Sequence, residues 1–168
     1  MKTWRHTPEE RREHHRLTTP GPWDTEPDKV QWIDEATDLD CLALRNRMGV
    51  WCGYVGLPPG HPLHGVTVNE IDFDVHGGIT FYGSLCQEEA DEGHGICHVP
   101  EPGRPADVWW IGFDCGHALD VCPAFVELES SFPTNIRASG GMFRTVYRDL
   151  DYVKAETASL ARQLADHA

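Results

Sequence analysis

The sequence has little basic charge. Its 168 residues include 14 lysines and arginines against 27 aspartates and glutamates, which gives a formal charge of -13. A protein that binds duplex nucleic acid needs clustered basic side chains to displace counterions from the phosphates, so this partner is not expected. The chain also lacks an apolar signal-peptide core and any run of about 18 apolar residues. We therefore expect no membrane association and a cytoplasmic location.

Strong functional motifs are absent as well. The sequence has no paired CxxC, no HExxH and no phosphate loop of the GxxxxGK type. Six cysteines are present, and without a secretory signal we expect reduced thiols rather than a disulfide framework. Cys86, His94, Cys97 and His98 are residue types that bind zinc, but their spacing matches no zinc finger. Whether these four residues form a zinc site stays open.

The composition is typical of a single folded domain. Hydrophobic residues make up 40% of the chain, and a chain of this length buries roughly two-thirds of its unfolded surface. We predict one α+β domain over 1–168, with a mostly antiparallel sheet and a helix from each end of the chain packed on it. The predicted parts are a helix over 7–17, a sheet-rich core over 28–122 with a long excursion at 83–107, and a helix over 147–166.

Local signals define both helices. Thr7 can cap the first helix, Pro8 fits its first turn, and Glu10 completes a capping box. The second helix is indicated by an apolar stripe at helical spacing, which predicts packing against the sheet. This stripe comprises Val146, Leu150, Val153, Leu160 and Leu164.

Two hairpins are predicted in the sheet region. The turn at 46–49 lies between strands at 41–45 and 50–57, and the second hairpin joins 71–75 to 79–82 through Gly77 and Gly78. The near-continuous apolar run at 108–113 predicts a central strand. Glycines at 53 and 56 indicate a close approach, by another strand or by a ligand.

Two apolar runs end in residues that can carry chemistry. Asp74 and His76 close the run that begins at Ile71, and His117 and Asp120 follow the run that begins at Trp109. Imidazole and carboxylate are both metal ligands, and a histidine held by a carboxylate is the usual general base. We expect these four residues to form either a divalent-metal site or a metal-free acid–base site. In the structural alternative, the aspartates cap the backbone and His117 packs under the tryptophans.

Other residues are candidates for ligand binding. A loop rich in proline and glycine at 58–65 carries two histidines, and functional residues concentrate on such loops. Adjacent tryptophans on a strand point to opposite faces, so one packs in the core and the other lines a cleft or meets a helix. The ligand-binding candidates are Trp51, Tyr54, His61, His64, Trp109, Trp110 and Asp114.

Several motifs carry a family resemblance. WCGYVG at 51–56, DVHGG at 74–78 and GFDCGH at 112–117, with GHP at 60–62 and ICHVP at 96–100, resemble an uncharacterised protein family of phage and bacterial genomes. The resemblance extends from Trp23 to Leu164 and supplies no known activity. It implies an accessory protein that counters host defence, a class that includes proteins that bind or destroy nucleotide second messengers.

Three functional hypotheses follow. The first, which we favour, is a small protein that sequesters a nucleotide-type ligand between the loop at His61 and the turn at 114–117. The second is a hydrolase of a nucleotide or other small phosphorylated substrate that uses the four His and Asp residues, with or without a divalent metal. The third is a protein-interaction module formed by exposed tryptophans. The oligomeric state stays open, and a divalent metal is the one cofactor that the residues suggest.

Overall fold

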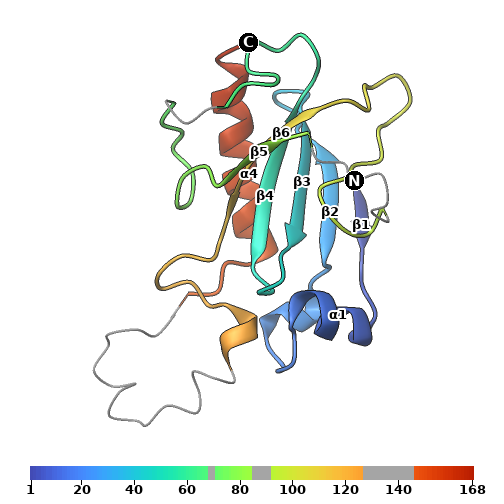
Figure 1. Ribbon diagram of the computed structural model, residues 1–168, viewed down its shortest axis with the longest axis vertical. Coiled ribbons are helices and arrows are strands. Elements are labelled where there is room, and N and C mark those ends of the chain that lie inside the picture. The colour runs from blue at the N-terminus through green and yellow to red at the C-terminus, as the bar shows by residue number, and fades with distance from the viewer. Residues whose placement is uncertain (68–70, 85–91, 127–145) are drawn as a thin grey trace.

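The computed structural model describes residues 1–67, 71–84, 92–126 and 146–168, and it has the predicted α+β fold. Its centre is a six-stranded antiparallel sheet in the order β1-β2-β3-β4-β6-β5 (Figure 1). The strands are β1 (Lys2–Trp4), β2 (Lys29–Ile33), β3 (Asp40–Arg45), β4 (Trp51–Leu57), β5 (Phe81–Gly83) and β6 (Trp109–Asp114). The helices are α1 (Pro8–His15) and α4 (Leu150–Ala165), with short 3-10 helices η1 (Pro22–Thr25) and η2 (Pro123–Phe125).

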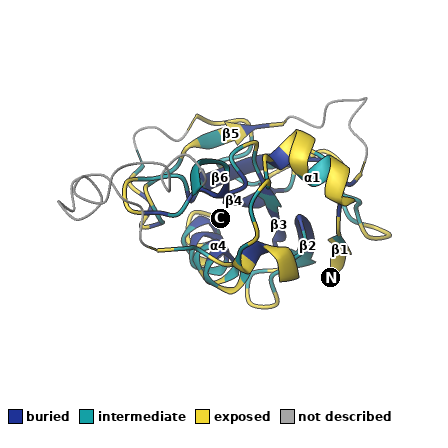
Figure 2. Ribbon diagram, turned by 90° about the horizontal axis from the view of Figure 1, so that it is seen from below, coloured by how far each residue is buried: buried dark blue, intermediate teal, exposed yellow. Residues whose placement is uncertain are grey.

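Helix α4 covers one face of the sheet, over β3 and β4 (Figure 1). The buried residues of α4, among them Val153 and Leu160, belong to the main apolar core. Figure 2 shows the buried parts of the strands and of α4 in dark blue. A Cβ at Gly53 would lie 2.4 Å from Thr157 Oγ1 of α4 and 2.6 Å from the ring of Phe113. The close approach expected at Gly53 is therefore made by a helix and a neighbouring strand, because only a glycine leaves room for both.

The described part of the long excursion covers the opposite face. The side-chain amide of Gln31 donates to Val99 O and accepts from Val99 N, both at 2.8 Å. Lys29 is buried, and its Nζ donates to the carbonyl oxygens of Glu92 at 2.7 Å and Cys97 at 2.6 Å. Polar side chains of β2 therefore hold this segment by its backbone. Beneath it lies a second apolar cluster: Leu42, Cys52, Tyr54, Val108 and Trp110.

Helix α1 begins as the sequence predicts, whereas α4 begins at Leu150, three residues after the predicted start. Val146 of the predicted apolar stripe lies before the helix and is exposed. The Thr7 hydroxyl accepts from Glu10 N–H, and the Glu10 carboxylate accepts from Thr7 N–H, so the capping box is confirmed. Asp149 caps α4 by accepting from Tyr152 N–H. Helix α1 lies at one end of the sheet rather than over a face (Figure 1). Its contact with the sheet region is polar, through an ion pair between Arg11 and Asp28.

The hairpin between β3 and β4 is confirmed, whereas the strand predicted over 71–75 is wrong. The backbone of Asp74 is bonded twice by Gln163 of α4, and His76 N–H donates to the Glu156 carboxylate. These side chains take the place of a neighbouring strand. The alternation in the sequence arises because Phe73 and Val75 are buried while Asp72 and Asp74 are exposed. The turn at Gly77 and Gly78 is present, with positive φ at both glycines.

The cysteines differ from expectation at one position. Cys41, Cys52, Cys115 and Cys122 are buried thiols, but Cys97 is disulfide-bonded. The expectation of a reduced thiol is therefore wrong for Cys97, which leaves no thiolate there for the hypothetical zinc site. Cys86, the other cysteine of that hypothesis, lies outside the described residues.

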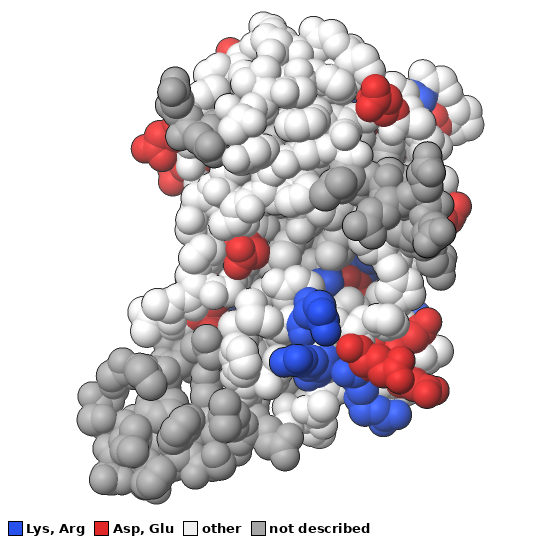
Figure 3. Space-filling view, viewed as in Figure 1, with Lys and Arg blue, Asp and Glu red and all other residues white. Residues whose placement is uncertain are grey.

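The surface charge is unevenly distributed. On the face shown in Figure 3, basic side chains gather around α1 next to acidic ones, while the upper part of that face is largely uncharged. The formal charge of -13 thus does not describe the surroundings of α1, where both signs meet. In the described part of the chain, no helix has the length and apolarity needed to cross a membrane.

Candidate functional site

Three of the predicted residues meet beside the first turn of α4. His76, His117 and Asp120 each place a ligand atom within 4.8 Å of those of the other two. His76 follows the extended segment that runs along α4, and the other two lie in the turn after β6. That turn is joined to the chain preceding α4 by a hydrogen bond of 2.7 Å from Val121 N–H to Val146 O. The convergence of two chain segments at one place is therefore as the sequence predicted.

Asp120 is the centre of this group. Its carboxylate is 2% exposed and accepts from Arg148 Nε at 2.9 Å on Oδ1. Oδ2 accepts from His76 Nε2 at 2.7 Å and from the backbone N–H of His117 at 3.2 Å. Burial alone raises the pKa of this carboxyl, but the bonds from Arg148 and His76 outweigh burial and hold the pKa below its usual range. Asp120 is therefore a buried, ionised acceptor.

His76 is bonded through both ring nitrogens. Because the Asp120 carboxylate can only accept, Nε2 of His76 carries the proton of their 2.7 Å contact. In the neutral ring Nδ1 then has the lone pair, which accepts from the Tyr152 hydroxyl at 2.9 Å. Burial, assisted by the nearby Glu156, raises the pKa of Tyr152, so the phenol keeps its proton. The three side chains form a continuous path for a proton from a hydroxyl through an imidazole to a carboxylate.

His117 lies against this path. Its ring centroid is 5.2 Å from that of His76, with the two planes at 70°. Nδ1 of His117 is buried, has no hydrogen-bond partner among the described residues, and lies 3.9 Å from Asp120 Oδ2. The turn at Gly77 presses on the same ring, since a Cβ there would lie 2.0 Å from His117 Cε1. His117 is therefore held in place by packing, while its Nδ1 stays unsatisfied among the described residues.

Asp74, the fourth predicted catalytic or metal residue, does not join this group. It is exposed, and its backbone is fixed to Gln163, a residue eleven positions after Tyr152 on α4. The spacing of two that suggested a shared face with His76 assumed a strand, and the segment is not one. The predicted metal set is thereby reduced to His76, His117 and Asp120.

The predicted aromatic residues are mostly inside the protein. Trp51 is fully buried, stacks under the Arg45 guanidinium at 4.4 Å and donates to the Glu26 carboxylate. Tyr54 and Trp110 belong to the apolar cluster under the excursion. None of these three rings is available for stacking on a ligand, because each already has its neighbours in the core.

The loop with His61 and His64 lies far from His76. His61 Nε2 contacts Leu164 O at 3.2 Å near the end of α4, whereas His76 contacts Tyr152 near its start. Twelve residues of helix separate these contacts by about 18 Å. Burial lowers the pKa of His61, in keeping with a neutral ring whose Nδ1 accepts from the next turn. The loop does not border the His76 site.

Trp109 and Asp114 stand at opposite ends of β6. The Trp109 indole donates to Val66 O at 3.1 Å beside the loop that carries His64. Asp114 Oδ1 accepts from Gly116 N–H at 2.8 Å, so this carboxylate caps its own turn. The predicted ligand-binding residues are thus divided between the core and two distant surfaces.

Three residues of the site were not predicted as site residues: Arg148, Tyr152 and Glu156. All lie in or just before α4, whose sequence shows only an apolar stripe and the charges opposite it. The apolar spacing locates the packed face of the helix, but it does not say which strand end the first turn approaches. The one signal in the sequence was the spacing of Tyr152 and Glu156, which lie one helical turn apart.

No protein-family model, curated protein or solved structure matches this chain. The functional argument therefore depends on the geometry of the site.

Proposed function

We propose that this protein is a hydrolase of a small phosphorylated molecule of the nucleotide class. The observation that carries this proposal is the path from Tyr152 through His76 to Asp120, with contacts of 2.9 and 2.7 Å. A histidine that is oriented by a buried carboxylate and bonded to a hydroxyl is the arrangement used for general base catalysis. The unsatisfied His117 and the Arg148 guanidinium, with its side chain 28% exposed, lie at the same carboxylate.

Each residue has a role in this proposal. Tyr152 takes a proton from the attacking water as it passes its own proton to His76 Nδ1. The new P–O bond to the water oxygen forms as the P–O bond to the leaving group breaks, and the leaving oxygen takes its proton from solvent. His76 becomes an imidazolium, which the ionised Asp120 stabilises through their hydrogen bond. Arg148 supplies the positive charge that a phosphate needs, and His117 is placed to bond the phosphate or the leaving group. The proton is therefore transferred toward the buried Asp120, while Arg148 at the surface neutralises the negative charge of the substrate phosphate.

The geometry favours this hydrolase over the ligand-sequestering hypothesis. Stacking of a base needs an accessible aromatic face, and Trp51, Tyr54 and Trp110 are buried in the core. In the metal-dependent version, His76, His117 and Asp120 are the ligands, since their donor atoms lie within 4.8 Å. Ion binding would require His76 to give up a bond to Asp120 or Tyr152, so we propose the metal-free path as the working mechanism.

The test is hydrolysis of bis(p-nitrophenyl) phosphate and of a panel of linear and cyclic nucleotides by the full chain. His76→Asn and His117→Ala should each lower kcat at least about 100-fold, since a positioned acid or base contributes 10²–10⁴. His167→Ala, at an exposed position near the C-terminus, is the control and should retain the parent rate. Unchanged turnover in both site variants would refute the proposal. A nucleotide recovered intact from the protein would instead support sequestration, and loss of rate with EDTA restored by Zn²⁺ would support the metal version.

A further inference from the structure

A second histidine cluster lies beside α1, away from the proposed active site. It borders a cavity of about 480 Å³ lined by residues that include His6, His14, His15, His94, Asp28 and Arg45. Four of the ten histidines of the chain therefore line one cavity. Imidazole is the commonest protein ligand for transition metals.

The hydrogen bonds of His6 and His15 fix which nitrogen of each ring carries the proton. His6 Nε2 contacts Gly93 O at 2.9 Å, and His15 Nδ1 contacts Asn46 O at 3.1 Å. A carbonyl oxygen only accepts, so both of these nitrogens must donate. In the neutral rings, the lone pairs are then on His6 Nδ1 and His15 Nε2.

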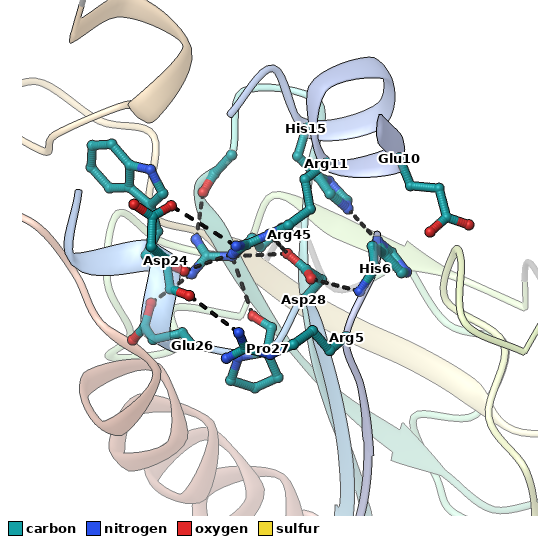
Figure 4. A network of polar contacts seen from close by, with 12 residues as sticks. Arg5, His6, Glu10, Arg11, His15, Asp24, Glu26, Pro27, Asp28 and Arg45 are labelled. Atoms are coloured by element: carbon teal, nitrogen blue, oxygen red, sulfur yellow. Dashed lines mark hydrogen bonds and ion pairs between the residues drawn. The ribbon is translucent and has the colours of Figure 1, made fainter. Parts of the chain in front are cut away.

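These two lone-pair nitrogens face each other at 2.8 Å. Figure 4 shows the two rings meeting at α1, with Asp28 alongside. Two lone pairs at this distance repel, so the contact is stable only when a positive species lies between or beside the nitrogens. That species is either a proton or a metal ion.

Asp28 supplies a third donor group. Its carboxylate places an oxygen within 4.8 Å of the two nitrogens and is 1% exposed. Arg11 Nε and the backbone N–H of His6 hold it in place, each at 2.9 Å (Figure 4). The carbonyls of Gly93 and Asn46 orient the two imidazoles from behind, as outer partners of metal-binding histidines do.

We propose that His6, His15 and Asp28 bind a divalent transition-metal ion, of which zinc is the representative. Two neutral imidazoles and a carboxylate are a usual protein donor set for Zn²⁺, and the fourth position faces the cavity that His14 and His94 also line. Tetrahedral ligation needs the two nitrogens about 3.3 Å apart, so each ring has to withdraw by a few tenths of an ångström. The ion would join the segment after β1, helix α1 and the residue that precedes β2.

The test is a titration of the untagged full chain, first dialysed against EDTA, with ZnCl₂ by isothermal calorimetry. We expect one equivalent of Zn²⁺ to bind, with affinity at least about tenfold lower in His15→Ala, the range seen when a ligand or its support is removed. His167→Ala, at an exposed histidine that belongs to neither His/Asp group, is the control and should bind as the parent does. Loss of binding in His117→Ala with binding retained in His15→Ala would overturn the proposal.

A second readout needs no substitution. In the parent protein, the ¹⁵N signals of His6 Nδ1 and His15 Nε2 should both shift on addition of one equivalent of Zn²⁺. If calorimetry and NMR both show no response, the nitrogens share a proton and the proposal is wrong. Neither measurement uses turnover, so the hydrolase proposal and this one can fail separately.

Discussion

Gly77 lies directly against the imidazole of His117. A Cβ at position 77 would be 2.0 Å from His117 Cε1 and 2.2 Å from Nε2, and Gly77 has a φ of +68°. The next residue, Gly78, has a φ of +82° with no atom within 4 Å of a Cβ. Both glycines thus have a left-handed backbone conformation, but only at Gly77 would a Cβ clash with a neighbouring side chain.

Alanine at these two positions should separate the two effects. Gly78→Ala should cost about 1 kcal/mol of unfolding free energy, from backbone strain alone. Gly77→Ala should cost at least about 1 kcal/mol more and lower kcat, because the methyl group displaces His117. Urea denaturation and phosphodiester hydrolysis measure both. Equal costs and equal rates in the two variants would contradict the packing described at His117.

Gln163 and Gln31 make the same contact in two places. Each bonds both the N–H and the C=O of one residue: Asp74 for Gln163, and Val99 for Gln31. Alanine at either position should cost about 1–2 kcal/mol, the value of two net hydrogen bonds. Only Gln163→Ala should lower kcat, by about tenfold or more, since it frees the segment that positions His76. A matching loss of kcat in Gln31→Ala would show that the effect is general destabilisation.

Arg45 is expected to be a major stability determinant. Its side chain is fully buried, pairs with Glu26 at 2.6 Å, and donates to Gly49 O and the Tyr147 hydroxyl. Arg45→Met should cost about 3–5 kcal/mol, because it leaves a largely buried carboxylate without its cation. Arg5→Met removes a guanidinium from an exposed residue and should cost less than about 1 kcal/mol. Urea denaturation of both variants checks this difference.

The low pKa of His15 predicts a pH dependence of stability in metal-free protein. The folded pKa is about 4 because the ring is buried, whereas an unfolded histidine has a pKa of about 6.5. Between these values the unfolded chain binds a proton that the folded protein does not, so stability falls as the pH falls from 6.5 to 4. The loss reaches about 3 kcal/mol at most. In EDTA, His15→Gln should flatten this slope, whereas the exposed His167→Gln should keep it.

Elements with local signals could be predicted from the sequence. Thr7 and Glu10 specify the start of α1 within four residues, and the turn at 46–49 joins strands that pair directly. The alternation at 71–75 was misleading because a segment between a helix and solvent has the same period as a strand. The local sequence pattern indicates that one side of a segment is buried, but it does not indicate which element of the structure buries it.

The candidate site could be predicted only in part. His76 and His117 were expected to meet because each follows an apolar run, and their rings do lie 5.2 Å apart. Tyr152 comes from a helix whose docking position no local pattern encodes. His15 contacts His6, nine residues earlier across a helix cap. Pairs of this kind depend on tertiary placement.

The Glu26 carboxylate links the start of α4 to the sheet. It accepts from Arg45, from Trp51, from the Tyr147 hydroxyl and from the first N–H of α4, at Leu150. Glu26 thus fixes the residue at which α4 begins, and with it the position at which Tyr152 contacts His76. A protein without residues 150–165 would therefore keep the strands of the sheet but lack Tyr152, so the proposed proton path requires α4.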